Sequence, residues 1–128
     1  MTAKKSKSNL LDKLPAFFDA GWVQFTFEKT KDLKDDESNK CFGITDFNKF
    51  VILLEENMSD KVAHHTIIHE VSHVLSETFG LGGPEEEKEE DKVVSSNEYI
   101  TEVVTRSFLM FKNLNPELWN LLYEEYYD

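Results

Sequence analysis

The chain has 128 residues, of which 40% are hydrophobic, and its formal net charge is −11. This length predicts a single domain with a small core. The negative charge argues against nucleic-acid binding, which requires basic side chains to neutralise phosphates. No apolar run approaches the roughly 18 residues of a membrane span, so we expect neither nucleic acid nor a membrane as a partner. Cys41 is the only cysteine, which excludes an internal disulfide and favours a reducing, cytoplasmic compartment.

The first half of the chain predicts a tail, a short helix and three strands. Residues 1–9 are basic and polar and lack the apolar segment of a secretory signal, so we expect a flexible tail before a single domain at 10–128. Asn9–Phe18 has helical spacing interrupted by Pro15 and is predicted to form a short helix. Alternating apolar and polar residues predict a half-buried strand at Trp22–Lys29. Two further strands are expected at Cys41–Thr45 and Phe50–Glu55.

The second half of the chain has helical periodicity. A long helix is predicted from Ser59 or Asp60, either of which could be its N-cap, to Phe79, with Gly80 as its stop. An acidic loop is expected at 81–94. The next helices are expected from near Ser95 to Lys112, and from Pro116 with Asn115 as its N-cap. Because strands precede helices, the predicted fold class is α+β, with a small antiparallel or mixed sheet of about three strands packed on these helices.

The sequence His69-Glu70-Val71-Ser72-His73 lies within the predicted long helix. Residues four apart lie one turn apart on the same helix face, so both imidazoles can reach one ion. Zinc accepts nitrogen ligands and, in catalytic sites, takes three protein ligands and a water. Glu70 would lie beside the ion, where its carboxylate could take a proton from the zinc-activated water. The spacing predicts His69 and His73 as Zn²⁺ ligands and Glu70 as general base, against the alternative of an exposed helix face without metal.

A third ligand is expected from the next helix, where Asn97-Glu98 is followed by Glu102 on the same helix face. A His-Glu-x-x-His motif with a later Asn-Glu pair resembles the gluzincins, the thermolysin-like metallopeptidases. The resemblance implies that Glu98 is the third zinc ligand. It also implies that Glu102, where the thermolysin pattern has Asp, hydrogen-bonds the ligand His69. Two alternatives stay open: Glu98 could form a capping box with Ser95, and Glu102 could be a solvated surface acid.

His65 precedes His69 by one helical turn. Three histidines along one straight helix make a poor zinc site, because His65 and His73 lie two turns apart, roughly 11 Å. We therefore expect His65 to contact a ligand histidine or the substrate, or to be an ordinary exposed histidine. Thermolysin-like enzymes also stabilise the oxyanion with a His or Tyr donor, and here Tyr99, His65 and Tyr123 are the candidates.

The chain from about Cys41 to Tyr126 is similar to the small zincin-type metallopeptidase domains encoded by bacteriophages and prophages. Those domains combine a few strands, the motif helix, a Glu-bearing helix and an Asn-Pro turn before a last helix, which here is Asn115-Pro116. The resemblance implies a zinc metallopeptidase whose protein or peptide substrate pairs with Phe50–Glu55 or its neighbour. For a phage protein, the compartment would be the host cytoplasm.

Two readings compete with the peptidase. The runner-up is a catalytically inactive zincin-fold phage protein that acts as a binding or structural partner, with the metal stabilising the fold. The other is an acidic protein that binds a basic surface through Asp32–Glu37 or Glu85–Asp91, in a manner sensitive to salt and independent of zinc.

Overall fold

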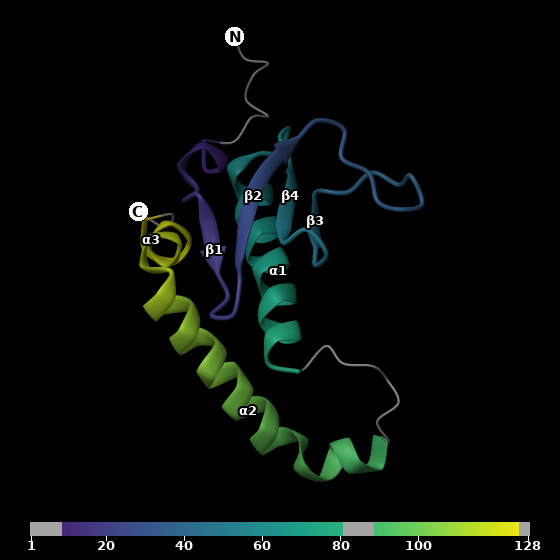
Figure 1. The fold of residues 1–128 in the computed structure, drawn as a ribbon, viewed down its shortest axis with the longest axis vertical. Helices are drawn as coiled ribbons and strands as arrows, with labels where there is room; N and C mark the ends of the chain where they lie inside the picture. The colour runs from purple at the N-terminus through teal and green to yellow at the C-terminus, as the bar shows by residue number, and fades with distance from the viewer. Residues whose placement is uncertain (1–8, 81–88, 126–128) are drawn as a thin grey trace.

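The computed structural model describes residues 9–80 and 89–125, and for residues 89–97 the backbone alone. These ranges form a four-stranded mixed sheet with helices beside it, which confirms the predicted α+β class (Figure 1). In the order β1-β2-β4-β3, β2 and β4 are parallel, and each outer strand is antiparallel to its neighbour. The predicted tail, up to residue 8, lies outside the described residues. The strands are β1 (Phe17–Asp19), β2 (Gln24–Thr30), β3 (Gly43–Asp46) and β4 (Val51–Glu55).

The sheet has one strand more than predicted, because β1 lies where the sequence predicted a short helix. The helical prediction for Asn9–Phe18 is wrong beyond a 3-10 turn at Leu11–Lys13, labelled η2. Proline disfavours helical backbone at the residue before it, and Leu14, which precedes Pro15, is extended with φ −64° and ψ 142°. The chain then enters β1, where Phe18 is fully buried against β2.

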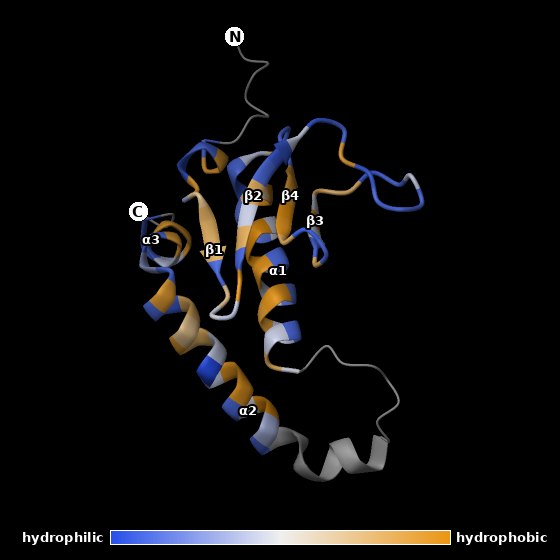
Figure 2. Cartoon of the chain, in the orientation of Figure 1, coloured by the Kyte–Doolittle hydropathy of each residue, from blue (hydrophilic) through white to orange (hydrophobic). Residues whose placement is uncertain are grey.

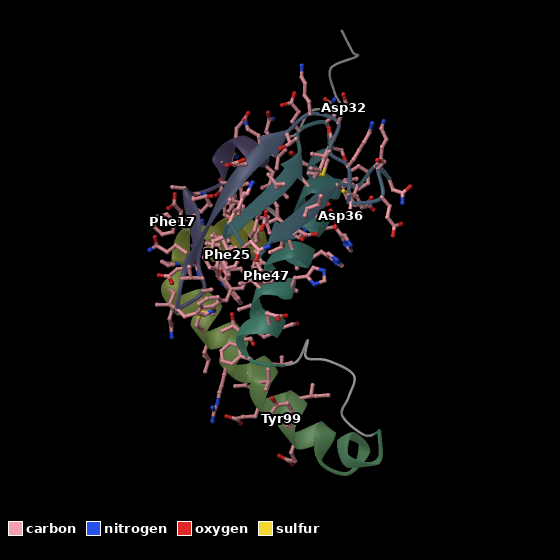
Figure 3. All side chains as sticks on the ribbon, turned by 45° about the vertical axis from the view of Figure 1, so that its right-hand side comes forward. Phe17, Phe25, Asp32, Asp36, Phe47 and Tyr99 are labelled. Carbon is pink, nitrogen blue, oxygen red and sulfur yellow. The ribbon has the colours of Figure 1, made fainter. Side chains whose placement is uncertain are left out.

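The strands predicted in the middle of the chain are present, with small shifts at their ends. Phe25 on β2 is fully buried between two exposed neighbours, as the alternation predicted. It packs edge-on against Phe47 in the turn between β3 and β4, with ring centroids 5.6 Å apart (Figure 3). Asp46 begins this turn, and its Oδ1 accepts hydrogen bonds from the backbone N–H groups of Asn48 and Lys49. These bonds favour the charged form and lower the pKa of the Asp46 carboxyl group.

Helix α1 (Asp60–Thr78) forms where predicted. Ser59 is its N-cap, and the Oγ of Ser59 accepts a hydrogen bond from the backbone N–H of Val62 at 3.3 Å. Gly80 has φ +84°, a left-handed conformation that glycine adopts easily and that ends the helix. One face of α1 packs against the sheet (Figure 1). Its buried apolar residues are Ala63, Ile67, Val71, Val74 and Leu75.

Helix α2 (Glu89–Leu114) begins earlier than the predicted start near Ser95. Residues 89–94 of the predicted acidic loop are therefore helical, and residues 81–88 lie outside the described part of the chain. Glutamate has a high intrinsic helix propensity, which favours the early start. α2 passes the C-terminal end of α1, and its N-terminal turns lie beyond that end (Figure 1). The chain continues with α3 (Pro116–Trp119) and the π-helical segment η3 (Asn120–Glu125).

None of the helices in the described part of the chain has the length and apolar character that a membrane crossing would require. Figure 2 shows the reason, since hydrophilic residues recur along both α1 and α2. The same figure shows that the loop between β2 and β3 is mostly hydrophilic. The apolar residues of α1 instead contribute to a core shared with the sheet and the C-terminal helices.

The junction between α2 and α3 holds β1 in place. Asn115 stands at the N-cap position of α3 as predicted, but its side chain makes no capping bond and is buried. Its Oδ1 instead accepts a hydrogen bond from the backbone N–H of Asp19 at 2.6 Å, and its Nδ2 donates to the backbone O of Asp19 at 2.8 Å. One side-chain amide therefore pairs with the backbone at the end of β1 and links the sheet to the C-terminal helices.

We expect Asn115→Ala to lower the free energy of unfolding by about 2–3 kcal/mol, because it leaves two backbone groups of Asp19 without their partner. Urea unfolding followed by circular dichroism would measure the change. Asn113→Ala is a matched control, since Asn113 is exposed on the same stretch of helix. Equal unfolding midpoints for Asn115→Ala and the wild type would contradict the proposed link to β1.

Candidate metal centre

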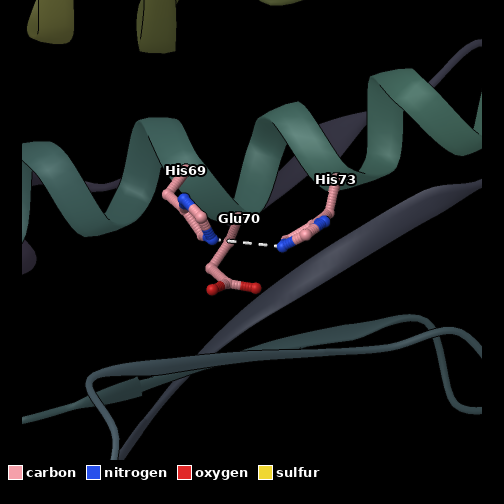
Figure 4. A group of neighbouring side chains, drawn as sticks. All are labelled: His69, Glu70 and His73. Carbon is pink, nitrogen blue, oxygen red and sulfur yellow. Dashed lines mark hydrogen bonds between the residues drawn. The ribbon is translucent and has the colours of Figure 1, made fainter. Parts of the chain in front are cut away.

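The two motif histidines lie one turn apart on the exposed side of α1, and their rings converge. The Nε2 atoms of His69 and His73 are 3.1 Å apart and form a hydrogen bond between the rings, whose planes are nearly perpendicular, at 87° (Figure 4). Both side chains are exposed, so an ion can approach the two nitrogens from solvent.

The separation of these nitrogens fits a shared zinc ion. With Zn–N bonds of about 2.0–2.1 Å, two nitrogens 3.1 Å apart subtend roughly 100° at the ion, which is close to the tetrahedral angle. Imidazole nitrogen is also a donor that suits zinc among the common divalent metals. The pair can therefore occupy two neighbouring corners of a tetrahedral site.

Glu70 lies between the histidines and the sheet. It is only 6% exposed, and a carboxylate oxygen lies within 4.8 Å of the ligand nitrogens of both histidines. Its Oε1 accepts a hydrogen bond from the hydroxyl of Thr45 on β3 at 2.6 Å. Figure 4 shows the carboxylate on the side of α1 where the two imidazoles meet. From this position it can accept a proton from a water molecule held beside the histidines.

The close approach of α1 to β3 depends on Gly43. A Cβ atom at this residue would lie 2.8 Å from Cγ2 of Thr66 and 2.9 Å from Cγ of Glu70, so these side chains or α1 itself would have to shift. Sequence reasoning missed both Gly43 and Thr45. A glycine inside a predicted strand is a known signal for close backbone approach, whereas a threonine is an ordinary strand residue and carries no such signal.

Glu98, the predicted third ligand, is not brought to the histidines. Among the side chains that the structure describes, Glu70 supplies the carboxylate that groups with them. The hydroxyl of Tyr99, next to Glu98, donates to the backbone O of Phe79 at 3.3 Å, which ties this part of α2 to the C-terminal end of α1. The ligand role of Glu98 stays a prediction, and it requires α2 to lie closer to the motif than it does here.

Glu102 and His65 were both predicted to lie beside the zinc ligands, but only His65 does so. Glu102 pairs with Arg106 through Oε2 and Nε at 2.8 Å, and both side chains are exposed on α2. His65 is exposed one turn before His69, and the two rings stack with centroids 6.2 Å apart and planes 21° apart. His65 therefore neighbours a candidate ligand, whereas Glu102 forms an ion pair within α2. Tyr123, a candidate oxyanion donor, packs against Trp119 with ring centroids 4.5 Å apart.

Cys41 lies near three acidic residues, one of which is Glu70. Burial raises the pKa of the Cys41 thiol, and the nearby charges of Asp35, Glu70 and Glu55 raise it further. Cys41 is therefore protonated at neutral pH and is a poor nucleophile or metal ligand.

A partly apolar groove of about 210 Å³ lies between α1, α2 and η3. Ile68 and Ser72 of α1 line it together with Val104 and Phe108 of α2. Ile68 and Ser72 each precede one of the motif histidines, and successive helix residues are rotated by about 100°. The histidines therefore lie between this groove and the side of α1 that faces β3.

Comparison with family models, curated proteins and solved structures found no match to this chain. The function of the chain is therefore inferred from the motif residues themselves.

Proposed function

We propose that this protein is a zinc-dependent metallopeptidase-like hydrolase, with His69 and His73 as metal ligands and Glu70 as the general base. The observation that carries the proposal is the 3.1 Å separation of the two Nε2 atoms beside a buried carboxylate. A bound zinc ion would polarise the substrate carbonyl and lower the pKa of a water molecule. The chain itself supplies the proton acceptor next to that position.

Glu70 has two tasks in this proposal. Its carboxylate accepts a proton from the attacking water and then donates that proton to the nitrogen of the leaving amine, so the enzyme gains no net proton. Burial and the hydrogen bond from Thr45 restrict the side chain to one place. A restricted carboxylate loses little conformational entropy when the substrate binds, which favours catalysis.

The proposed substrate is an extended segment of a protein or peptide that pairs with β3. Of the strands considered from sequence, β4 lies between β2 and β3, whereas its neighbour β3 is at the edge of the sheet. An edge strand can pair with an added strand through its backbone groups. Since Thr45 on β3 contacts Glu70, such a segment would pass beside the histidines. The groove lined by Ile68 and Phe108 offers an apolar surface for one of its side chains.

A second candidate function is a metal-stabilised binding protein without turnover. The buried position of Glu70 favours it, because a carboxylate oxygen within 4.8 Å of both imidazole nitrogens can bind the ion directly, and Glu70 would then not act as the general base. Zinc would stabilise the fold of this small domain, and a partner protein would bind elsewhere on its surface.

Elemental analysis after incubation with zinc tests the metal site, and we expect about one zinc per chain. Glu98→Ala shows whether α2 supplies a ligand, with Glu117→Ala as the control at another exposed helical glutamate. A loss of zinc only in Glu98→Ala would assign the third ligand, and equal contents would remove Glu98 from the site. Absence of zinc from the wild type would contradict both candidate functions. Cleavage of a random mixture of quenched fluorescent peptides by the zinc-loaded protein separates the hydrolase from the binding protein.

A further inference from the structure

The face of β3 that meets α1 is built around the side chain of Glu70. Gly43 and Thr45 are two residues apart and therefore point to the same face of the strand. Their partners in the register with β4 are Leu54 and Ile52, which are both fully buried on that face.

Each oxygen of the Glu70 carboxylate has a distinct environment on this face. Oε1 accepts the hydrogen bond from Thr45 Oγ1 at 2.6 Å, a length typical of a hydroxyl bonded to an ionised carboxylate. An ionised carboxylate can only accept, so the hydroxyl must be the donor. Oε2 lies above Gly43, where a Cβ atom would come within 3.1 Å of it. The Thr45 hydroxyl therefore fixes Oε1, and the absence of a side chain at Gly43 leaves space for Oε2.

We infer that Thr45 is a positioning residue for Glu70, and that Gly43 provides the space in which the positioned carboxylate lies beside the two histidines. This inference rests on the proposed function, because the carboxylate matters as a proton acceptor only if the histidines hold a metal. A glutamate side chain has several rotatable bonds and would otherwise sample several rotamers. The hydrogen bond from Thr45 selects the rotamer in which a carboxylate oxygen lies within 4.8 Å of both imidazole nitrogens.

The same arrangement couples substrate binding to the general base. β3 is the edge strand, so a peptide that pairs with it would contact the backbone of the strand that also carries Thr45. Any shift of β3 on binding would move the hydroxyl and therefore the carboxylate.

Binding of acetohydroxamate to the zinc-loaded protein tests this inference. Acetohydroxamate chelates zinc and carries an N–OH proton that a neighbouring carboxylate can accept, so its affinity reports the position of Glu70. We expect Thr45→Val to weaken binding by roughly 5–10-fold, the effect of loosening one charge-assisted hydrogen bond. Thr45→Ser keeps the hydroxyl and should bind within about twofold of the wild type. Thr26→Val, at an exposed threonine of β2, is the control.

A double-mutant cycle separates positioning from a general loss of structure. In the Glu70→Gln background, Thr45→Val should cause little further loss of acetohydroxamate affinity, because the two residues act as one unit. Zinc content and melting temperature are measured for every variant, and Thr45→Ala replaces Thr45→Val if the latter does not fold. The inference would be overturned if the folded variant without the Thr45 hydroxyl bound acetohydroxamate as tightly as the wild type. It would also be overturned if removing the hydroxyl weakened binding as much in the Glu70→Gln background as in the wild type. Neither outcome would contradict the proposed function. Absence of zinc from the wild type would overturn it together with the proposed function.

Discussion

Replacing His73 with alanine is expected to abolish zinc binding and to remove the part of the thermal stability that depends on zinc. His73 supplies one of two nitrogens that lie 3.1 Å apart, and a single exposed imidazole is a weak site for the ion. A ligand present at one hundred times its Kd stabilises the folded state by about 2.7 kcal/mol. For a domain of this size that corresponds to roughly 10 °C in Tm. Differential scanning fluorimetry with and without zinc would measure the difference.

His65→Ala is the matched control for this experiment. His65 is also exposed on α1, one turn before His69, and it stacks on the same ring. It is too far along the helix from His73 for both to bind one ion, so His65→Ala should keep its zinc and its zinc-dependent rise in Tm. The metal-free Tm should change little in either variant, because both side chains are exposed. If His73→Ala keeps zinc as the wild type does, the ion is held elsewhere.

The helix that carries the motif was predictable because its signals are local. Ser59 caps it, Gly80 ends it in a left-handed conformation, and both signals lie next to the residues that they govern. His69 and His73 lie on the same face of α1 because of helix geometry alone, since residues four apart lie on one side of a helix. Sequence reasoning therefore reached this part of the candidate site without knowledge of the fold.

The remaining features depend on contacts that are distant in sequence. Asn115 has the local signature of an N-cap, yet its amide bonds to Asp19, 96 residues away. Thr45 has no distinguishing signal in the sequence, because its role appears only when β3 lies against Glu70. The distance from Glu98 to the histidines depends on how α2 packs against α1. The hydrophobic periodicity of each helix does not determine that packing. Local patterns thus predicted most of the elements and the histidine pair, but they missed β1 and the groups that surround the histidines.

Glu70→Gln is expected to keep zinc binding and to lower peptide hydrolysis by about 10²–10⁴-fold, the usual contribution of a general base. The amide is similar in size to the carboxylate, and its oxygen can still accept the hydrogen bond from Thr45, so the fold should be retained. What the variant loses is the capacity to take a proton from water at neutral pH. Zinc content, Tm and the cleavage rate of quenched fluorescent peptides would be measured on the same preparation.

Glu77→Gln is the control for this variant, because Glu77 is an exposed glutamate near the end of the same helix. It should hydrolyse peptides at the wild-type rate. Equal rates for Glu70→Gln and the wild type, with zinc bound in both, would show that another group accepts the proton. A loss of zinc in Glu70→Gln would instead make Glu70 a ligand of the ion. Glu70 would then bind the ion in place of Glu98 and could no longer act as the general base, so the metal-stabilised binding protein would become the better-supported function.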